Sequence, residues 1–201
     1  MGGEMMQGLI GLSKLFALVN ASALALGRWL GAACILLMVI FILAQVFFRY
    51  VIGLALPWPE EASRFLMLWS AGLMIGTAYR RGGFVAIELL VALLPGLLRH
   101  LLTLALLSLA LVILWKAWQI GLREVTGLAG RFGTDSLNVP TSWDLSSWRK
   151  VPKSWQMSSM LVGIAALISV TLELILREVI SALGRRDDLP AISDQVMLGA
   201  E

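Results

Sequence analysis

The chain has 201 residues, of which 59% are hydrophobic and only 14% are charged, and its mean hydropathy is +0.85. A water-soluble domain carries more charge than this on its surface, so the composition excludes an ordinary soluble globule and indicates an integral membrane protein. The net charge of +3 comes from cations at the ends of apolar runs, where membrane anchors lie. It therefore indicates contact with membrane lipid and not nucleic-acid binding.

The single cysteine and the single histidine exclude further classes. Cys34 has no second thiol in the chain with which to form a disulfide, and His100 alone cannot ligate a haem from both faces. A membrane thiol oxidoreductase and a cytochrome b are thus excluded, and no cofactor or metal site is expected. Cys34 is interpreted as a small apolar residue within a helix, and His100 as a residue at a helix end.

The N-terminal segment before residue 29 predicts an amphipathic helix that leads into the first membrane span. Polar residues such as Ser13 and Asn20 fall on one face, and apolar residues recur on another at spacings of three and four. A secretory signal is the alternative, because residues 21–23 resemble a cleavage site, but Glu4 and Lys14 do not fit one. The apolar face consists of Leu9, Leu12, Phe16, Val19, Ala23, Leu26 and Leu30.

Four apolar runs approach the length of about 20 residues that crosses a bilayer. The last run contains Glu173 four residues before Arg177, and we interpret the two as a salt-bridged helix end at the water boundary, in preference to a proton-relay carboxylate. The predicted spans are about residues 29–48, 60–79, 101–118 and 157–176.

A fifth apolar stretch, about residues 84–98, contains Glu88 near its middle. Spanning the membrane would place this carboxylate in lipid at a cost of about 3 kcal/mol. We therefore predict an interfacial helix between spans two and three. The expected fold is an all-α integral membrane protein, one membrane domain with four transmembrane helices, an N-terminal amphipathic helix and this interfacial helix.

The remaining segments are polar. Residues 123–153 are expected to form a compact, ordered loop outside the membrane, and residues 185–201 a mobile tail. Four spans place both termini on one side. The cations divide almost evenly between the two sides, and the pairs Arg80-Arg81 and Arg185-Arg186 favour cytoplasmic termini.

The link between spans one and two carries the densest group of unusual residues. Each has a structural interpretation: Glu60 and Glu61 suit the first turn of a helix, Glu60 and Arg64 are spaced for an ion pair, and Gly72 and Gly76 form a GxxxG step that admits a neighbouring helix. Because the link is short, we also expect Arg49 to pair with Glu60 or Glu61 across the top of the hairpin.

This group resembles the signature of the small membrane (DctQ-type) subunit of tripartite ATP-independent periplasmic (TRAP) transporters, most strongly over residues 45–95. Two positions depart from it, since the family commonly has His where this chain has Phe84 and Asp where it has Glu88. The residues that carry the resemblance are Arg49, Tyr50, Trp58, Glu60, Glu61, Arg64, Trp69, Gly72, Gly76, the run from Arg80 to Gly83, Ile87 and Glu88.

The resemblance implies a bacterial inner-membrane complex in which a periplasmic solute-binding protein delivers an organic acid to a large membrane subunit, which moves it with sodium. The small subunit would be a fixed scaffold with no catalytic site. Ten motif residues would serve structure or the subunit interface: Arg49, Tyr50, Trp58, Glu60, Glu61, Arg64, Trp69, Gly72, Gly76 and Glu88. A self-contained exporter would need an intramembrane carboxylate, and a membrane enzyme would need facing acidic residues. An accessory or assembly protein of an unrelated complex is the remaining alternative.

Overall fold

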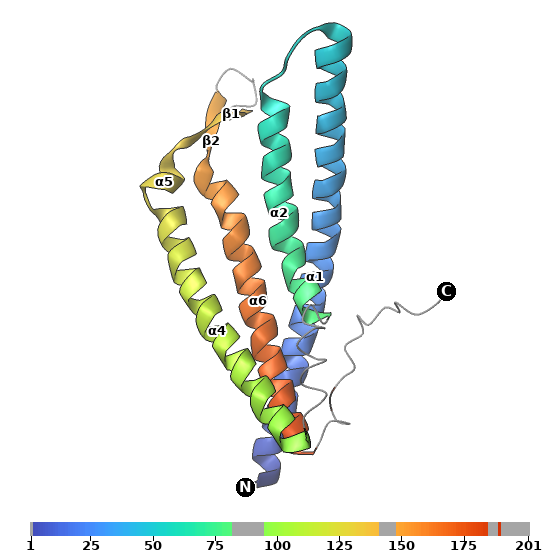
Figure 1. Ribbon diagram of the computed structural model, residues 1–201, viewed down its shortest axis with the longest axis vertical. Helices are drawn as coiled ribbons and strands as arrows, with labels where there is room; N and C mark the ends of the chain where they lie inside the picture. Colours follow the sequence, from blue (N-terminus) through green and yellow to red (C-terminus); the bar gives the residue numbers. More distant parts are fainter. Residues whose placement is uncertain (1, 82–94, 141–147, 185–188, 190–201) are drawn as a thin grey trace, which may run out of the picture. The chain divides into compact units, whose positions relative to one another are not determined.

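The computed structural model describes residues 2–81, 95–140, 148–184 and 189. Helices make up most of this part of the chain, and a small β-hairpin separates the last two long helices (Figure 1). The elements in order are α1 (Gly2–Phe47), the π-helix η1 (Phe48–Ile52), α2 (Trp58–Arg80), α4 (Gly96–Thr126), α5 (Leu128–Arg131), β1 (Gly133–Pro140), β2 (Trp148–Pro152) and α6 (Lys153–Ala182).

The chain divides into two compact units, and each contains part of every long helix. The first unit holds the beginning of α1, the end of α2, the beginning of α4 and the end of α6. The second unit holds the other parts of these helices together with α5 and the hairpin. Their boundaries are Met1–Ala25, Ile75–Lys116 and Ala165–Glu201 for the first unit, and Leu26–Met74 and Ala117–Ile164 for the second.

Three of the described helices are long and apolar enough to cross a membrane: Gln7–Ile52, Gly96–Thr126 and Lys153–Ala182. The predicted helical membrane class is therefore confirmed. The helix α2 is not among the three, because charged residues occupy its first turns and its last residue. A fourth span in α2 stays a prediction.

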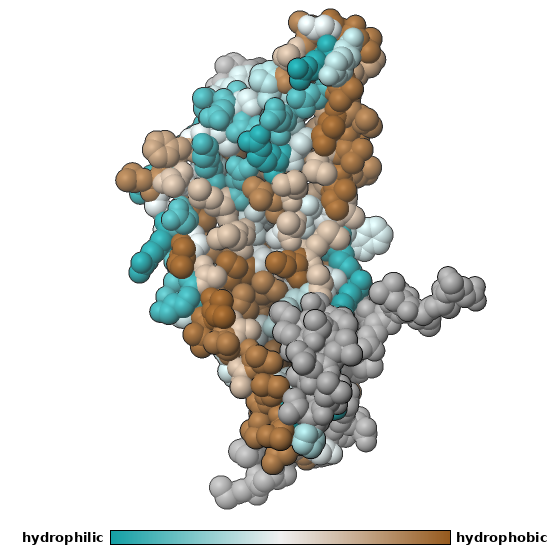
Figure 2. All heavy atoms as spheres, viewed as in Figure 1, coloured by the Kyte–Doolittle hydropathy of each residue, from teal (hydrophilic) through white to brown (hydrophobic). Residues whose placement is uncertain are grey.

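The N-terminal helix buries the polar face of the predicted amphipathic pattern. The predicted amphipathic helix and the predicted first span form one continuous helix, α1. In this helix Ser13 is only 1% exposed and Asn20 only 4%. The predicted apolar face is instead open, with Val19 53% and Leu26 61% exposed. Lipid covers apolar side chains as well as protein does, so a membrane helix turns its small and polar residues inward. Apolar side chains accordingly line the upper part of α1 in Figure 2.

The other long helices extend beyond their predicted spans. The helix α4 begins at Gly96 and α6 ends at Ala182, because backbone hydrogen bonding continues through the polar residues next to the apolar runs. The last three residues assigned to the interfacial helix, 96–98, form the first turn of α4. Residues 84–94 of that segment, including Glu88, lie outside the described residues, as does the tail from residue 185 except residue 189.

The loop between spans three and four contains regular structure that the sequence did not predict. The strands β1 and β2 pair antiparallel, with Asn138 opposite Lys150 and Gly133 opposite Pro152, and the register is irregular between Gly133 and Asn138. At the base of the hairpin the Lys153 amide donates to the Phe132 carbonyl oxygen at 2.8 Å. The strand β1 contains Gly, Asp, Asn and Pro, which are depleted in strands, and β2 has only five residues, so the pattern indicated a loop.

Candidate functional site

Glu61, in the first turn of α2, holds the hairpin through hydrogen bonds to its carboxylate. Its Oε1 accepts from the Asp135 amide at 3.0 Å, and its Oε2 accepts from the amides of Ser136 at 2.6 Å and Leu137 at 3.1 Å. The Ser136 hydroxyl also donates to Oε2 at 2.6 Å. These amides lie in the part of β1 where the register with β2 is irregular, so Glu61 satisfies donors that the strand ladder leaves open.

The expected pairing of Arg49 with Glu60 or Glu61 is wrong. Glu60 binds Arg64 one turn further along α2 at 2.9 Å, as the spacing predicted, and both side chains are largely exposed. The Glu61 carboxylate accepts hydrogen bonds from amides of β1. The guanidinium carbon of Arg49 instead lies 5.9 Å from the centre of the Tyr50 ring, and Tyr50 is 77% exposed.

The two motif tryptophans make contacts within the second unit. The rings of Trp58 and Phe41 meet edge to face with centroids 5.4 Å apart, which joins the start of α2 to α1. The indole N–H of Trp69 donates to the carbonyl oxygen of Trp155 at 3.2 Å, which joins α2 to α6. Both side chains thus serve helix packing.

The motif glycines lie where other helices approach closely. A Cβ atom at Gly72 would stand 2.3 Å from the carbonyl oxygen of Ser159 on α6, so no larger residue fits without moving the backbone. A Cβ atom at Gly76 would stand 2.8 Å from a methyl group of Leu24 and 2.9 Å from the Cβ of Ala166. The GxxxG step is therefore a close-packing surface in this structure.

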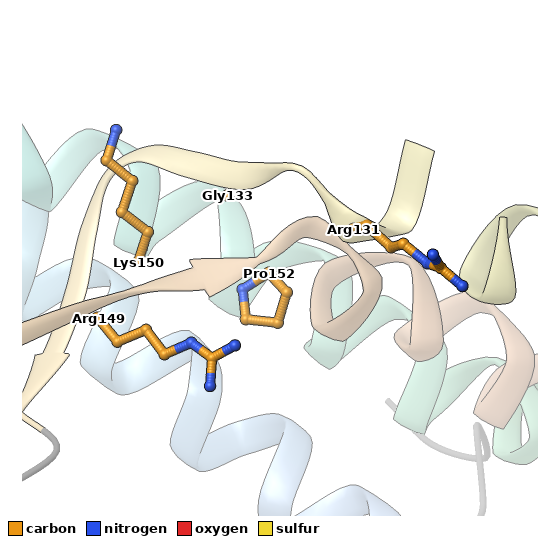
Figure 3. A pocket seen from close by; sticks show the side chains of 5 residues that line it. All are labelled: Arg131, Gly133, Arg149, Lys150 and Pro152. Atoms are coloured by element: carbon orange, nitrogen blue, oxygen red, sulfur yellow. The ribbon is translucent and has the colours of Figure 1, made fainter. Parts of the chain in front are cut away.

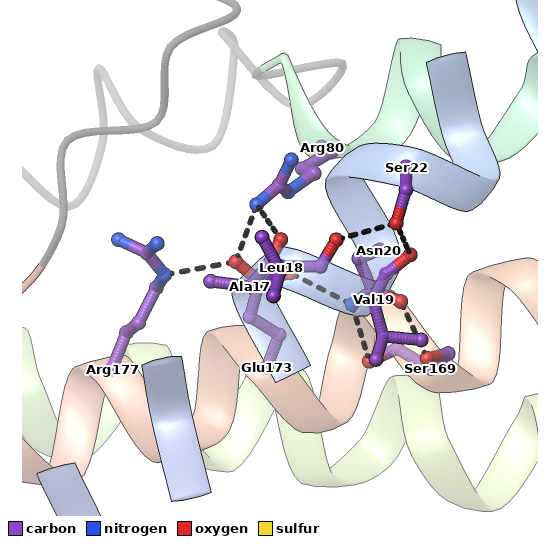
Figure 4. Close-up of polar contacts among 9 residues, drawn as sticks. All are labelled: Ala17, Leu18, Val19, Asn20, Ser22, Arg80, Ser169, Glu173 and Arg177. Atoms are coloured by element: carbon purple, nitrogen blue, oxygen red, sulfur yellow. Dashed lines mark hydrogen bonds and ion pairs between the residues drawn. The ribbon is translucent and has the colours of Figure 1, made fainter. Parts of the chain in front are cut away.

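In the first unit, side chains from α1, α2 and α6 meet at the carboxylate of Glu173, which is 0% exposed (Figure 4). Its Oε1 accepts from Arg80 Nη2 at 2.8 Å and from Arg177 Nε at 3.1 Å. Its Oε2 accepts from Asn20 Nδ2 at 2.7 Å. The predicted pair with Arg177 is confirmed, and the carboxylate is buried among three helices. Its place at the water boundary stays a prediction.

Backbone groups complete this set of contacts. Arg80 also donates to the Ala17 carbonyl oxygen at 3.2 Å. The Ser169 hydroxyl donates to Asn20 Oδ1 at 2.6 Å, and Asn20 Nδ2 lies 3.3 Å from the Ser169 carbonyl oxygen. Sequence reasoning missed the roles of Asn20 and Ser169. The available signal was the row Ser13, Ala17 and Asn20, whose helical spacing places small and polar residues on one face.

These arrangements serve structure better than chemistry. The Glu173 carboxylate is paired with two arginines, and the Glu61 carboxylate accepts hydrogen bonds from β1. Among the residues that the structure describes, no group of three or more His, Cys, Asp and Glu side chains is placed to hold a metal ion. Of the ten residues singled out from the sequence, Glu88 alone lies outside the described ranges.

Glu173→Gln preserves the shape of the side chain but removes the charge that faces two arginines. Loss of one partner from a buried ion pair costs about 3–5 kcal/mol. We expect a clear fall in the melting temperature of the purified chain in detergent. Glu60→Gln is the matched control, because its exposed pair with Arg64 contributes at most about 0.5 kcal/mol. Equal melting temperatures for both variants would show that Glu173 does not stabilise the helices.

Glu61→Gln weakens the acceptor that three amides of β1 share. We expect faster hydrogen exchange at residues 135–137, measured by mass spectrometry, because hydrogen bonds to a charged acceptor are roughly twice as strong as those to a neutral one. Glu60→Gln should leave these amides protected. Unchanged exchange in Glu61→Gln would mean that the carboxylate charge does not hold the hairpin.

Comparison with known proteins assigns the chain to a family. The family model for the DctQ component of tripartite ATP-independent periplasmic transporters matches residues 38–180, which include the whole motif from Arg49 to Glu88. No curated protein and no solved structure gives a significant match. Since the matched range covers well over half of the chain, this protein belongs to the DctQ family, the small membrane component of TRAP transporters.

Proposed function

We propose that this chain scaffolds the large membrane subunit of a TRAP transporter during sodium-coupled uptake of an organic acid that a periplasmic binding protein delivers. Membership of the DctQ family makes the chain a component of a three-part transport system and not a member of an enzyme family. The scaffold role, the sodium coupling and the class of solute are the proposed steps. The proposed location is the bacterial inner membrane.

The observation that supports a scaffold most directly is that the buried Glu173 carboxylate is held by three partners. A carboxylate that couples transport to an ion must release its partners to bind that ion. Glu173 instead accepts from Arg80, Arg177 and Asn20 at 2.7–3.1 Å while fully buried. Such a contact set favours one fixed arrangement of helices, which is the property that a brace for a moving partner requires.

The apolar surfaces of the long helices support the same role. In the most apolar 18-residue stretch of the helix Gln7–Ile52, which is α1 continued by η1, only 6% of the residues are buried. In the corresponding stretch of α4 none are. These helices therefore offer broad apolar faces to surrounding lipid and to a membrane partner. A scaffold that packs beside a large membrane subunit needs such faces.

The chain reconstituted alone into lipid vesicles should take up no solute. Uptake should appear only when a large TRAP membrane subunit and a binding protein loaded with an organic acid are both present, and it should require an inward sodium gradient. Vesicles without the small chain are the matched control. Sodium-driven uptake by the small chain alone would contradict the scaffold role.

We propose that both termini face the cytoplasm and that the hairpin faces the periplasm. In a Cys34→Ala background, an impermeant thiol reagent applied to intact spheroplasts should label Asn138→Cys and leave Leu183→Cys unlabelled. Both positions are exposed, and Asn138 lies outside the Glu61 contact set. Lysed spheroplasts should label at both positions. Preferential labelling at residue 183 in intact spheroplasts would reverse the orientation.

A further inference from the structure

The hairpin is tied closely to the ends of two helices that are apolar enough to span a membrane. The short helix α5 begins two residues after α4 ends at Thr126, and α6 begins directly after β2. Arg131 is therefore five residues from the end of α4, and Lys150 is three residues from the start of α6. Side chains at the base of the hairpin consequently lie near the membrane boundary, within reach of lipid headgroups.

This base carries a basic hollow of about 270 Å³. Figure 3 shows Pro152 at its middle, with Arg131 on one side and Arg149 and Lys150 on the other. The cationic groups stand apart and do not converge on one point. This spacing suits an anion with several separated oxygen atoms better than a single small ion. The lining residues are Arg131, Gly133, Arg149, Lys150 and Pro152.

Exposed apolar side chains lie within three residues of the lining residues in the sequence. Leu128 is 77% exposed, Phe132 65%, Trp148 57% and Trp155 58%. Tryptophan and phenylalanine beside arginine and lysine are typical of the headgroup region, where rings enter the acyl boundary and cations meet phosphates. An acidic protein surface would match the cations but leave these apolar side chains facing polar groups or water.

The segment that contains the hollow also carries a net positive charge. Residues 123–153 contain five cations and three acids. The cations are Arg123, Arg131, Arg149, Lys150 and Lys153, and the acids are Glu124, Asp135 and Asp144.

We propose that this basic hollow binds the headgroup of an anionic phospholipid, with Arg131, Arg149 and Lys150 contacting the phosphate and the other polar oxygen atoms of the headgroup and the neighbouring aromatic residues contacting the acyl boundary. Arginine pairs well with phosphate through its fork of N–H donors, and basic pockets at membrane helix ends are suited to anionic headgroups. The bound lipid would fix the depth of the hairpin in the membrane. This proposal does not depend on the transporter role.

Native mass spectrometry of the full chain in an uncharged detergent tests the site. The probes are phosphatidylglycerol and phosphatidylcholine with identical acyl chains. The wild-type chain should bind the first phosphatidylglycerol more tightly than the first phosphatidylcholine. The variant R131Q/R149Q/K150Q should weaken phosphatidylglycerol binding roughly tenfold to hundredfold and leave phosphatidylcholine binding unchanged.

Two controls separate a local site from a general charge effect. K14Q/R49Q/K116Q removes the same charge from three exposed cations outside the hairpin and should retain the preference for phosphatidylglycerol. R131K/R149K keeps the charge and should retain most of it. An equal loss in both triple variants, or no preference in the wild-type chain, would overturn the proposal. The proposal would also be overturned if R131Q/R149Q/K150Q kept its preference for phosphatidylglycerol but no longer bound an acidic periplasmic binding protein.

Discussion

Side chains from α1, α2 and α6 meet at the Glu173 carboxylate, and the packing of the first unit is organised around this contact. Between membrane helices the hydrophobic effect supplies little attraction, because lipid tails are as apolar as leucine. Hydrogen bonds and close backbone approach must then hold the helices. A buried carboxylate with partners at 2.7–3.1 Å meets that need, since an unpaired charge in the same place costs several kcal/mol.

The same constraint explains which face of α1 is buried. Ser13, Ala17, Asn20 and Leu24 form its buried row, and Gly27 and Gly31 continue that row into the second unit, where they meet Leu73 and Met74 of α2. Sequence periodicity found both faces of the helix correctly. It did not show which face is buried, because periodicity does not report whether water or lipid lies outside.

Local contacts could be predicted from the sequence, and distant ones could not. The pairs of Glu60 with Arg64 and of Glu173 with Arg177 are four residues apart on one helix, and both are present. Glu61 finds its partners 74–76 residues away on β1. The proximity of Arg49 and Glu61 at one boundary suggested a pair, but a carboxylate oriented by a helix start accepts readily from a run of open amides.

The helix α2 shows why apolarity alone is a poor guide to membrane packing. Among the described residues, it is the one long helix that is not apolar enough to be counted as a membrane span. It nevertheless supplies contacts in both units. In one unit it contributes Gly76 and Arg80, and in the other Glu61, Trp69 and Gly72. Each of these residues lowers the apolarity of the helix and each makes an interhelical or hairpin contact. A helix surrounded by neighbours needs small and polar residues for packing, whereas a helix surrounded by lipid does not. The low apolarity of α2 and its central part in the packing therefore have the same cause.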